Sequence, residues 1–183
     1  MQEDEKKFMG HLYFVRHGQT IWNVEGKICG ATDIALTELG HEQAIATGKK
    51  ILEEHIYADE ILYSPLMRAA DTAKHISEVT GIPARVEQRL KEQNFGRWES
   101  TPRNGAEFQV AKQSFVCSYE GGESMLRLAQ RIYNLLDEIK AQSGLSKGRR
   151  FTTVLIGSLT RFFQTSVRAG QHGSRWQKTE RYD

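Results

Sequence analysis

Short, continuous apolar runs alternate along this chain with longer stretches in which apolar residues recur at helical spacing. The apolar runs predict buried β-strands at 13–15, 61–63, 84–87 and 148–156. The helical spacing predicts helices from 38 to about 54, from 66 to about 80 and from 123 onward. Strands that alternate with helices in this way are typical of an α/β fold.

The ends of the predicted helices carry suitable boundary residues. Thr37 stands at the N-cap of the first helix, Pro65 fits the first turn of the second, and Gly81 fits its end. The stripe assigned to the first helix consists of Glu38, Leu39, Ala44, Ile45, Gly48, Ile51 and Leu52. The stripe of the last helix consists of Met125, Leu128, Ala129, Ile132, Leu135, Leu136 and Ile139.

The middle of the chain is less regular. Residues 102–118 predict one helix at about 106–115, accompanied by a lid-like loop. Three aromatic residues in and beside this stretch either line a pocket or pack together, and the pattern alone leaves both options open: Phe108, Phe115 and Tyr119.

The first predicted strand stops abruptly at Arg16-His17-Gly18. In an open α/β sheet, ligands bind in the crevice outside the carboxyl ends of the strands, so these three residues are expected to face a pocket. Arg16 offers a planar fork of donors to phosphate oxygens, His17 offers a nucleophilic nitrogen, and Gly18 lets the backbone approach a bulky anion. The chemistry favours phosphate, although the same tripeptide also fits a solvated turn.

Several other polar residues have a plainer interpretation. His41 and His55 fit the solvated surface of the first predicted helix, and His75 is expected to be solvated as well. From composition alone, Arg68 is a surface cation in the first turn of the second helix. Glu92, in a charged stretch, is ordinarily a carboxylate that faces solvent.

Composition and charge narrow the classes of protein and partner. The chain has 183 residues and no Gly/Ser linker, so one domain is expected. Its net charge of +2 gives no reason to expect a nucleic acid or a membrane as partner, although a local basic pocket can attract a small phosphorylated substrate. No apolar run suits a signal peptide or a membrane span, which predicts a cytoplasmic protein. Cys29 and Cys117 lack metal-ligand spacing and are expected to be free thiols.

Five ordered segments resemble the histidine phosphatase superfamily, which includes the cofactor-dependent phosphoglycerate mutases. The resemblance covers residues 11–143. Its motifs are Arg16-His17-Gly18-Gln19-Thr20 with Asn23, then Leu36-Thr37-Glu38-Leu39-Gly40, Tyr63-Ser64-Pro65-Leu66-Met67-Arg68-Ala69, Leu90-Lys91-Glu92 with Phe95-Gly96-Arg97-Trp98-Glu99, and Gly121-Gly122-Glu123-Ser124.

The resemblance implies a role for each matching residue at the first strand's end. His17 is the implied nucleophile that accepts the phosphoryl group. Arg16, Asn23 and Arg68 are the implied phosphate-binding residues, helped by the backbone at Gly18. Two guanidinium groups on one phosphoryl group would neutralise the charge that grows during transfer. No metal and no organic cofactor is implied for hydrolysis.

The same resemblance assigns the proton donor. Glu92 is the implied acid that protonates the leaving oxygen, and Glu99 is the second choice. A proton donor needs a carboxyl whose pKa is raised, which partial burial beside Phe95 and Trp98 would supply. Ser100 stands where the family often has glycine, a mild departure.

The resemblance fails at the carboxyl end of the chain. The family places a second catalytic histidine at the end of the last strand, where this chain has Ile156 or Leu159, depending on the alignment. Ser158 can supply one hydrogen bond to phosphate but no imidazole, and His172 is the only downstream histidine. Residues 158–183 form an atypical tail. Natural loss of activity, an altered active site and a damaged reading of the gene's end all remain open.

The sequence therefore predicts a single three-layer α/β domain over residues 1–183, with helices on both faces of a mostly parallel sheet. The expected function is hydrolysis of phosphate monoesters through phosphohistidine at His17, impaired by the missing histidine. A phosphoglycerate mutase is the second choice, because the chain is short for that group. A protein that binds a phosphorylated ligand without turnover is the third.

Overall fold

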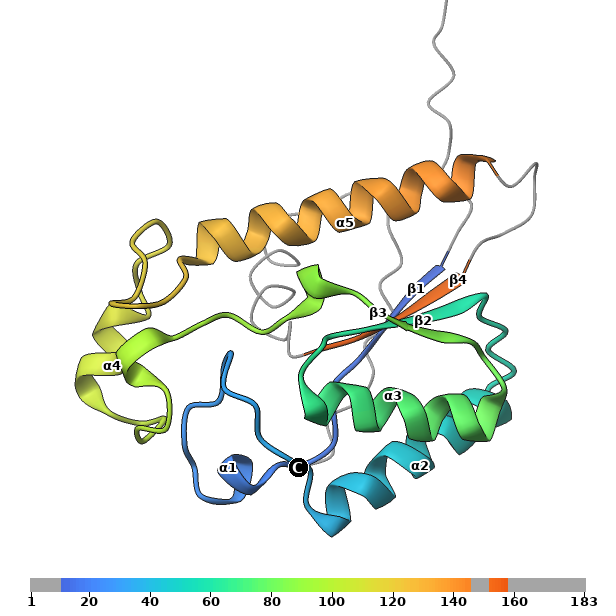
Figure 1. Cartoon of the computed structure of the whole chain (residues 1–183), viewed down its shortest axis with the longest axis horizontal. Helices are drawn as coiled ribbons and strands as arrows, with labels where there is room; N and C mark the ends of the chain where they lie inside the picture. The colour runs from blue at the N-terminus through green and yellow to red at the C-terminus, as the bar shows by residue number, and fades with distance from the viewer. Residues whose placement is uncertain (1–10, 146–151, 158–183) are drawn as a thin grey trace, which may run out of the picture.

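A four-stranded sheet forms the centre of the computed structural model, which describes residues 11–145 and 152–157 (Figure 1). Its strands are β1 (His11–Val15), β2 (Glu60–Tyr63), β3 (Ala84–Val86) and β4 (Thr152–Ile156). Their order is β1-β4-β2-β3, and each neighbouring pair is parallel. Ile156 pairs with Val15 on one side and Tyr63 on the other. The predicted α/β fold with a parallel sheet is confirmed.

Helices cover both faces of the sheet (Figure 1). On one face lie α2 (Glu38–Glu53) and α3 (Met67–Thr80), and on the other lies α5 (Met125–Leu145). Two short helices and two 3-10 turns occupy the connections: α1 (Ile21–Val24), α4 (Ala106–Ala111), η1 (Gln88–Leu90) and η2 (Gly96–Trp98).

Alternate residues of each central strand enter separate apolar clusters. Ile61 packs against Ala73 and Ile76 of α3, whereas the next residue, Leu62, packs against Leu128 on the α5 side. This alternation follows from the period of two in a β-strand. Because full burial of one Leu or Ile contributes about 2 kcal/mol, these two clusters supply the main driving force for folding.

The helix boundaries follow the predicted residues closely. Thr37 Oγ1 accepts a hydrogen bond from the Gly40 amide, so Thr37 is the N-cap of α2. Gly81 ends α3 with φ of 74°, a left-handed conformation that favours glycine. The first turn of α3 has no cap of its own, and Asp33 Oδ1, from a distant loop, accepts from the Met67 amide at 2.7 Å.

The predicted apolar stripe of α2 is too wide. Leu39 is 48% exposed and Leu52 is 49% exposed. The buried residues of α2 are instead Gly40, Ala44, Gly48 and Ile51, and a Cβ at Gly48 would lie 2.9 Å from Val79 Cβ. At Gly48 the close approach of α2 and α3 therefore leaves no room for a side chain.

The middle of the chain also differs from its prediction. Helix α4 ends at Ala111, and Phe115 lies beyond it with 46% of its surface exposed. Phe108 and Tyr119 are buried and pack with Ile28, against Phe95 and Trp98. Of the two options left open for the aromatic residues, packing therefore holds for Phe108 and Tyr119.

Two of the three histidines expected to be solvated are half-buried instead. His41 of α2 and His75 of α3 face each other, with Nδ1 of His41 2.9 Å from Nε2 of His75. The prediction was wrong because α2 and α3 pack side by side and bring the two surfaces together. His55 is exposed, as predicted.

Candidate active site

The predicted nucleophile lies at the carboxyl edge of the sheet. Strand β1 ends at Val15, Arg16 is exposed, and His17 turns back into the protein with 7% of its surface exposed. Strand β2 ends at the same edge and leads into α3, which carries Arg68 in its first turn. Parallel strands thus bring His17 and Arg68 together from positions 51 residues apart.

His17 is held in one tautomer by its neighbours. Its Nδ1 lies 2.7 Å from the Gly18 carbonyl, which can only accept, so Nδ1 carries the proton. Nε2 therefore presents a lone pair, and Arg68 Nε donates to it at 3.2 Å. Burial, helped by the charges of Arg68 and Arg16, lowers the pKa of His17 to about 3. The imidazole is neutral at physiological pH, the state that a nitrogen nucleophile requires.

Arg68 is a buried cation, with 1% of its surface exposed. Its Nη1 donates to the Thr32 carbonyl at 2.9 Å and its Nη2 to the Gly30 carbonyl at 2.6 Å. Thr72, one turn later on α3, donates to the Arg68 carbonyl and accepts from the Gly18 amide. The guanidinium is therefore fixed beside His17.

Glu99, the second choice for the proton donor, is occupied by backbone amides. Its carboxylate accepts from the amides of Gly30 at 3.1 Å, Ala31 at 2.8 Å, Thr32 at 3.1 Å and Phe95 at 3.0 Å. A carboxylate with four such donors holds a loop in place and has little capacity left to approach a substrate. The four contacts favour Glu92 over Glu99 as the acid.

Gly18 and Asn23 serve local structure as well. A Cβ on Gly18 would lie 2.2 Å from the Gly40 carbonyl oxygen, so glycine allows α2 to approach the loop after β1. Asn23 forms a capping box with Thr20: the Thr20 amide donates to Asn23 Oδ1 at 3.0 Å. The side-chain amide nitrogen of Asn23, Nδ2, is then the group that can donate to an anion.

Glu92 lies next to a polar cavity of about 330 Å³, and its side chain is buried, with 9% exposed. Its Oε1 accepts from the Gln93 amide at 2.7 Å. The cavity is lined in part by Ala31, Lys91, Asn94, Arg127 and Arg131. Arg131 is paired with Glu123, whereas the exposed Lys91 and Arg127 add positive charge to the rim. Such a cavity suits an anionic ligand.

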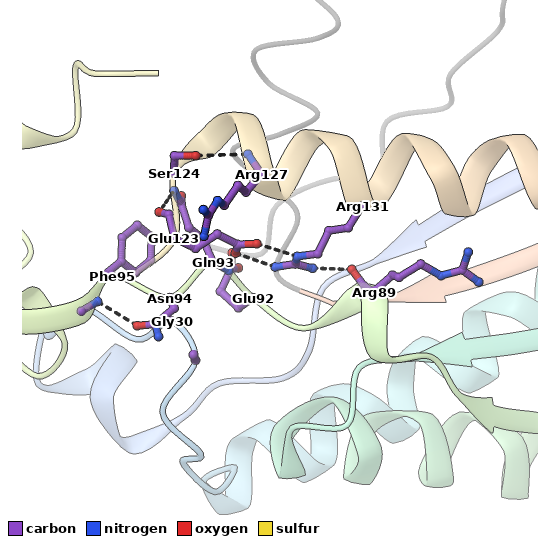
Figure 2. A network of polar contacts seen from close by, with 12 residues as sticks. Gly30, Arg89, Glu92, Gln93, Asn94, Phe95, Glu123, Ser124, Arg127 and Arg131 are labelled. Carbon is purple, nitrogen blue, oxygen red and sulfur yellow. Dashed lines mark hydrogen bonds and ion pairs between the residues drawn. The ribbon is translucent and has the colours of Figure 1, made fainter. Parts of the chain in front are cut away.

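A clasp between Arg131 and Glu123 fixes the segment that carries Glu92 (Figure 2). Arg131 Nε and Nη2 each donate to the Glu123 carboxylate at 2.9 Å, and its Nη1 donates to the Arg89 carbonyl. The Glu123 amide donates to the Asn94 carbonyl at 2.8 Å. The start of α5 therefore holds the residues on both sides of Glu92.

Cys29 lies within electrostatic reach of Arg68, Glu99 and Glu92. Burial raises the pKa of its thiol, so the neutral thiol predominates at physiological pH.

The sequence showed only a free cysteine at position 29. It also carried no signal for the carbonyls of Gly30 and Thr32, because backbone contacts do not depend on residue type. Thr72, four residues after Arg68 on the same helix face, was within reach of sequence reasoning.

Of the two positions at which the family's second histidine was expected, the structure describes Ile156. Ile156 has no exposed surface and packs in the α2 and α3 cluster with Val15. Ser158, Leu159 and His172 lie outside the described residues, with the rest of the 158–183 tail. In the described part of the chain, no cluster of three or more potential ligands suits a metal ion, and no helix has the length and apolarity to cross a membrane.

Residues 12–156 match the sequence profile of the histidine phosphatase superfamily (branch 1). The probable phosphoglycerate mutase GpmB of Yersinia pestis (strain Pestoides F) is 35% identical over 136 residues, which are 70% of this chain and 62% of that protein. The same identity and coverage hold for GpmB of Yersinia pseudotuberculosis serotype O:3 (strain YPIII). The chain thus spans less than two thirds of these curated relatives.

Solved structures show the same likeness. The mycobacterial glucosyl-3-phosphoglycerate phosphatase with VO3 has a TM-score of 0.72 and 29% identity, covering 87% of this chain and 81% of that one. TTHB049 from Thermus thermophilus has a TM-score of 0.60 and 29% identity, covering 80% and 76%. With this match extending from β1 to the end of β4, the chain belongs to the histidine phosphatase superfamily, branch 1.

Proposed function

We propose that the protein hydrolyses small phosphate monoesters through a phosphohistidine intermediate on His17. The observation that carries this proposal is the state of His17: a buried imidazole with a pKa of about 3, the proton on Nδ1 and Nε2 beside Arg68. A protonated imidazole has no lone pair for attack, so this environment favours a nucleophile at any physiological pH.

In the first step, His17 Nε2 attacks phosphorus. The N–P bond forms as the P–O bond to the alcohol breaks, and Glu92 gives its proton to the leaving oxygen. Arg68 and Arg16 neutralise the charge on the transferred phosphoryl group, with the amide of Asn23 as a further donor. Gly18 supports the site by letting α2 approach and by bonding to Thr72.

In the second step, a water molecule attacks the phosphohistidine. Glu92, now ionised, takes a proton from that water, the N–P bond breaks, and inorganic phosphate leaves. His17 returns to its neutral state, and Glu92 is protonated again. The cycle uses only side chains of this protein and water, so the proposal includes no cofactor and no metal.

One comparison favours hydrolysis over mutase chemistry. A phosphatase with bound VO3 is among the similar structures at 29% identity, and vanadate is a chemical analogue of phosphate. A mutase would return the phosphoryl group to a phosphoglycerate, which requires the intermediate to be shielded from water.

The missing second histidine sets the expected rate. Loss of one group that stabilises transition-state charge typically lowers turnover about 100- to 1,000-fold. Weak but measurable activity is therefore expected, and the contact of Arg68 with His17 supports this expectation. The alternative is a protein that binds a phosphorylated ligand and does not turn it over, and the absent histidine motivates it.

The test compares the full chain with His17→Ala in hydrolysis of p-nitrophenyl phosphate. Intact-mass analysis at neutral pH, where phosphohistidine survives, is expected to show one added phosphoryl group in the wild type only. Glu92→Gln should still form the phosphoenzyme from this activated ester, because its leaving group needs no proton. The same variant should hydrolyse the phosphoenzyme more slowly than the wild type.

The outcomes separate the candidate functions. Equal rates in the wild type and a folded His17→Ala variant would remove His17 as the nucleophile. A phosphoenzyme that persists in water and discharges only when a phosphoglycerate is added would indicate a mutase. Binding of vanadate without phosphoenzyme or turnover would indicate the non-catalytic alternative.

A further inference from the structure

The loop of residues 30–32 lies between two oppositely charged side chains. All three of its amides donate to the Glu99 carboxylate, at 2.8 to 3.1 Å. Two of its carbonyls, those of Gly30 and Thr32, accept from the Arg68 guanidinium. The backbone therefore connects an anion to a buried cation, because its peptide dipoles point their positive ends at Glu99 and their negative ends at Arg68.

The fit around this loop is tight. A Cβ on Gly30 would lie 2.4 Å from Glu99 Oε1 and 2.2 Å from the Gln93 carbonyl oxygen. No side chain fits between the carboxylate and the loop. Glu99 also accepts from the Phe95 amide, so it anchors the loop to the segment that follows Glu92. The next loop residue, Asp33, caps the first turn of α3, where Arg68 resides.

Arg68 needs this support because it is almost completely buried. An isolated charge in such a place carries a large desolvation cost, which must be offset by hydrogen bonds and opposite charge. The two carbonyls supply the hydrogen bonds, and Glu99 supplies the opposite charge through the peptides that it binds.

We propose that Glu99 is a positioning residue for the reaction: it holds the 30–32 loop so that the loop's carbonyls aim Arg68 at His17 Nε2. Glu99 itself does not touch the substrate. The catalytic consequence rests on the proposed function, whereas the geometric consequence for Arg68 and His17 does not.

Removal of the Glu99 charge should release this arrangement. In Glu99→Gln the side-chain amide nitrogen replaces one carboxylate oxygen, and an N–H group then faces the amides of Gly30 and Thr32. The loop must turn, and Arg68 moves away from His17. Because Arg68 contributes to the low pKa of His17, that pKa should rise toward its ordinary value.

The experiment records the His17 imidazole by NMR between pH 2 and 8 in the full-length wild type, Glu99→Gln and Glu107→Gln. Glu107 is an exposed carboxylate in the first turn of α4 and serves as the matched control. Steady-state hydrolysis of p-nitrophenyl phosphate is measured on the same samples. Circular dichroism confirms that each variant is folded.

We expect the His17 titration of Glu99→Gln to move up by about one pH unit or more, while Glu107→Gln matches the wild type. Where hydrolysis is measurable, kcat/KM should fall about 10- to 100-fold. In an Arg68→Met background, Glu99→Gln should move the His17 titration no further, since the cation that transmits the effect is gone.

A folded Glu99→Gln variant with the wild-type His17 titration would overturn the proposal, as would an equal shift with and without Arg68. If Glu99→Gln does not fold, Glu99→Asp, which keeps the charge but is one methylene shorter, is assessed by the same titration: a raised His17 pKa would support the proposal, and the wild-type titration would overturn it. Because that titration needs no turnover, a shift in an inactive protein would support the positioning role and count only against hydrolysis.

Discussion

At the scale of single residues, the low pKa of His17 makes the free energy of unfolding depend on pH. Its pKa is about 3 in the folded protein and about 6.5 in an unfolded chain. Because of this depressed pKa, between pH 6.5 and 3 the unfolded state binds a proton that the folded state does not bind. The contribution of His17 to the free energy of unfolding is therefore fully present above pH 6.5 and is lost as the pH falls toward 3.

This linkage predicts the pH dependence of unfolding. Between pH 6.5 and 4, His17 should lower the free energy of unfolding of the wild type by about 1 kcal/mol per pH unit, and His17→Asn should lack this component. Urea unfolding at pH 7, 6 and 5 measures the difference. His55→Asn, at an exposed histidine, should keep the wild-type slope. Parallel curves for the wild type and His17→Asn would contradict the prediction.

At the scale of elements, the contact between α5 and the Glu92 segment depends on one arginine. Only a guanidinium can pair with Glu123 through two nitrogens and still reach the Arg89 carbonyl with a third. Lysine keeps the charge but presents a single nitrogen, so it cannot hold both partners.

Arg131→Lys should therefore lower the free energy of unfolding by about 2 kcal/mol, the usual cost of losing hydrogen bonds to a charged group. It should also lower the turnover of p-nitrophenyl phosphate, because Glu92 loses its support. Arg97→Lys is the control: Arg97 pairs with Glu120 on the surface, where ion pairs contribute little. Urea denaturation and steady-state kinetics provide the two measurements, and equal losses in both variants would argue against the clasp.

At the scale of the whole molecule, the fold decides what a residue can do at the position where the family's second histidine was expected. The two alignments of the sequence put this position at Ile156 or Leu159. In the fold, Ile156 lies on the central strand β4 with no exposed surface, in the apolar cluster that joins the sheet to α3. This position is a core position.

Ile156→His is accordingly expected to destabilise the protein by about 3 kcal/mol or more, without raising the rate of hydrolysis. Ile156→Val, which keeps the site apolar, should cost about 1 kcal/mol. Thermal or urea unfolding together with the p-nitrophenyl phosphate assay gives both numbers. A rate increase in Ile156→His would show that the residue reaches the active site after all. Leu159 lies outside the described residues and stays a prediction.

The sequence by itself determined the elements and the class of chemistry. Apolar runs and helical stripes are local patterns, and so are boundary residues such as Thr37 and Gly81, so they predicted α2, α3, α5 and the parallel strands. The Arg16-His17-Gly18 motif at a strand end indicated phosphate chemistry, and the motifs indicated the superfamily.

Only the tertiary structure decided how these residues work together. The pairing of His41 with His75 and the exposure of Leu39 depend on how closely two helices pack, which no local pattern specifies. The low pKa of His17 arises from burial and from Arg68, a residue far along the chain. The four amides on Glu99 and the carbonyls on Arg68 are backbone groups, identical in every residue type, so their roles become visible only when the chain is folded.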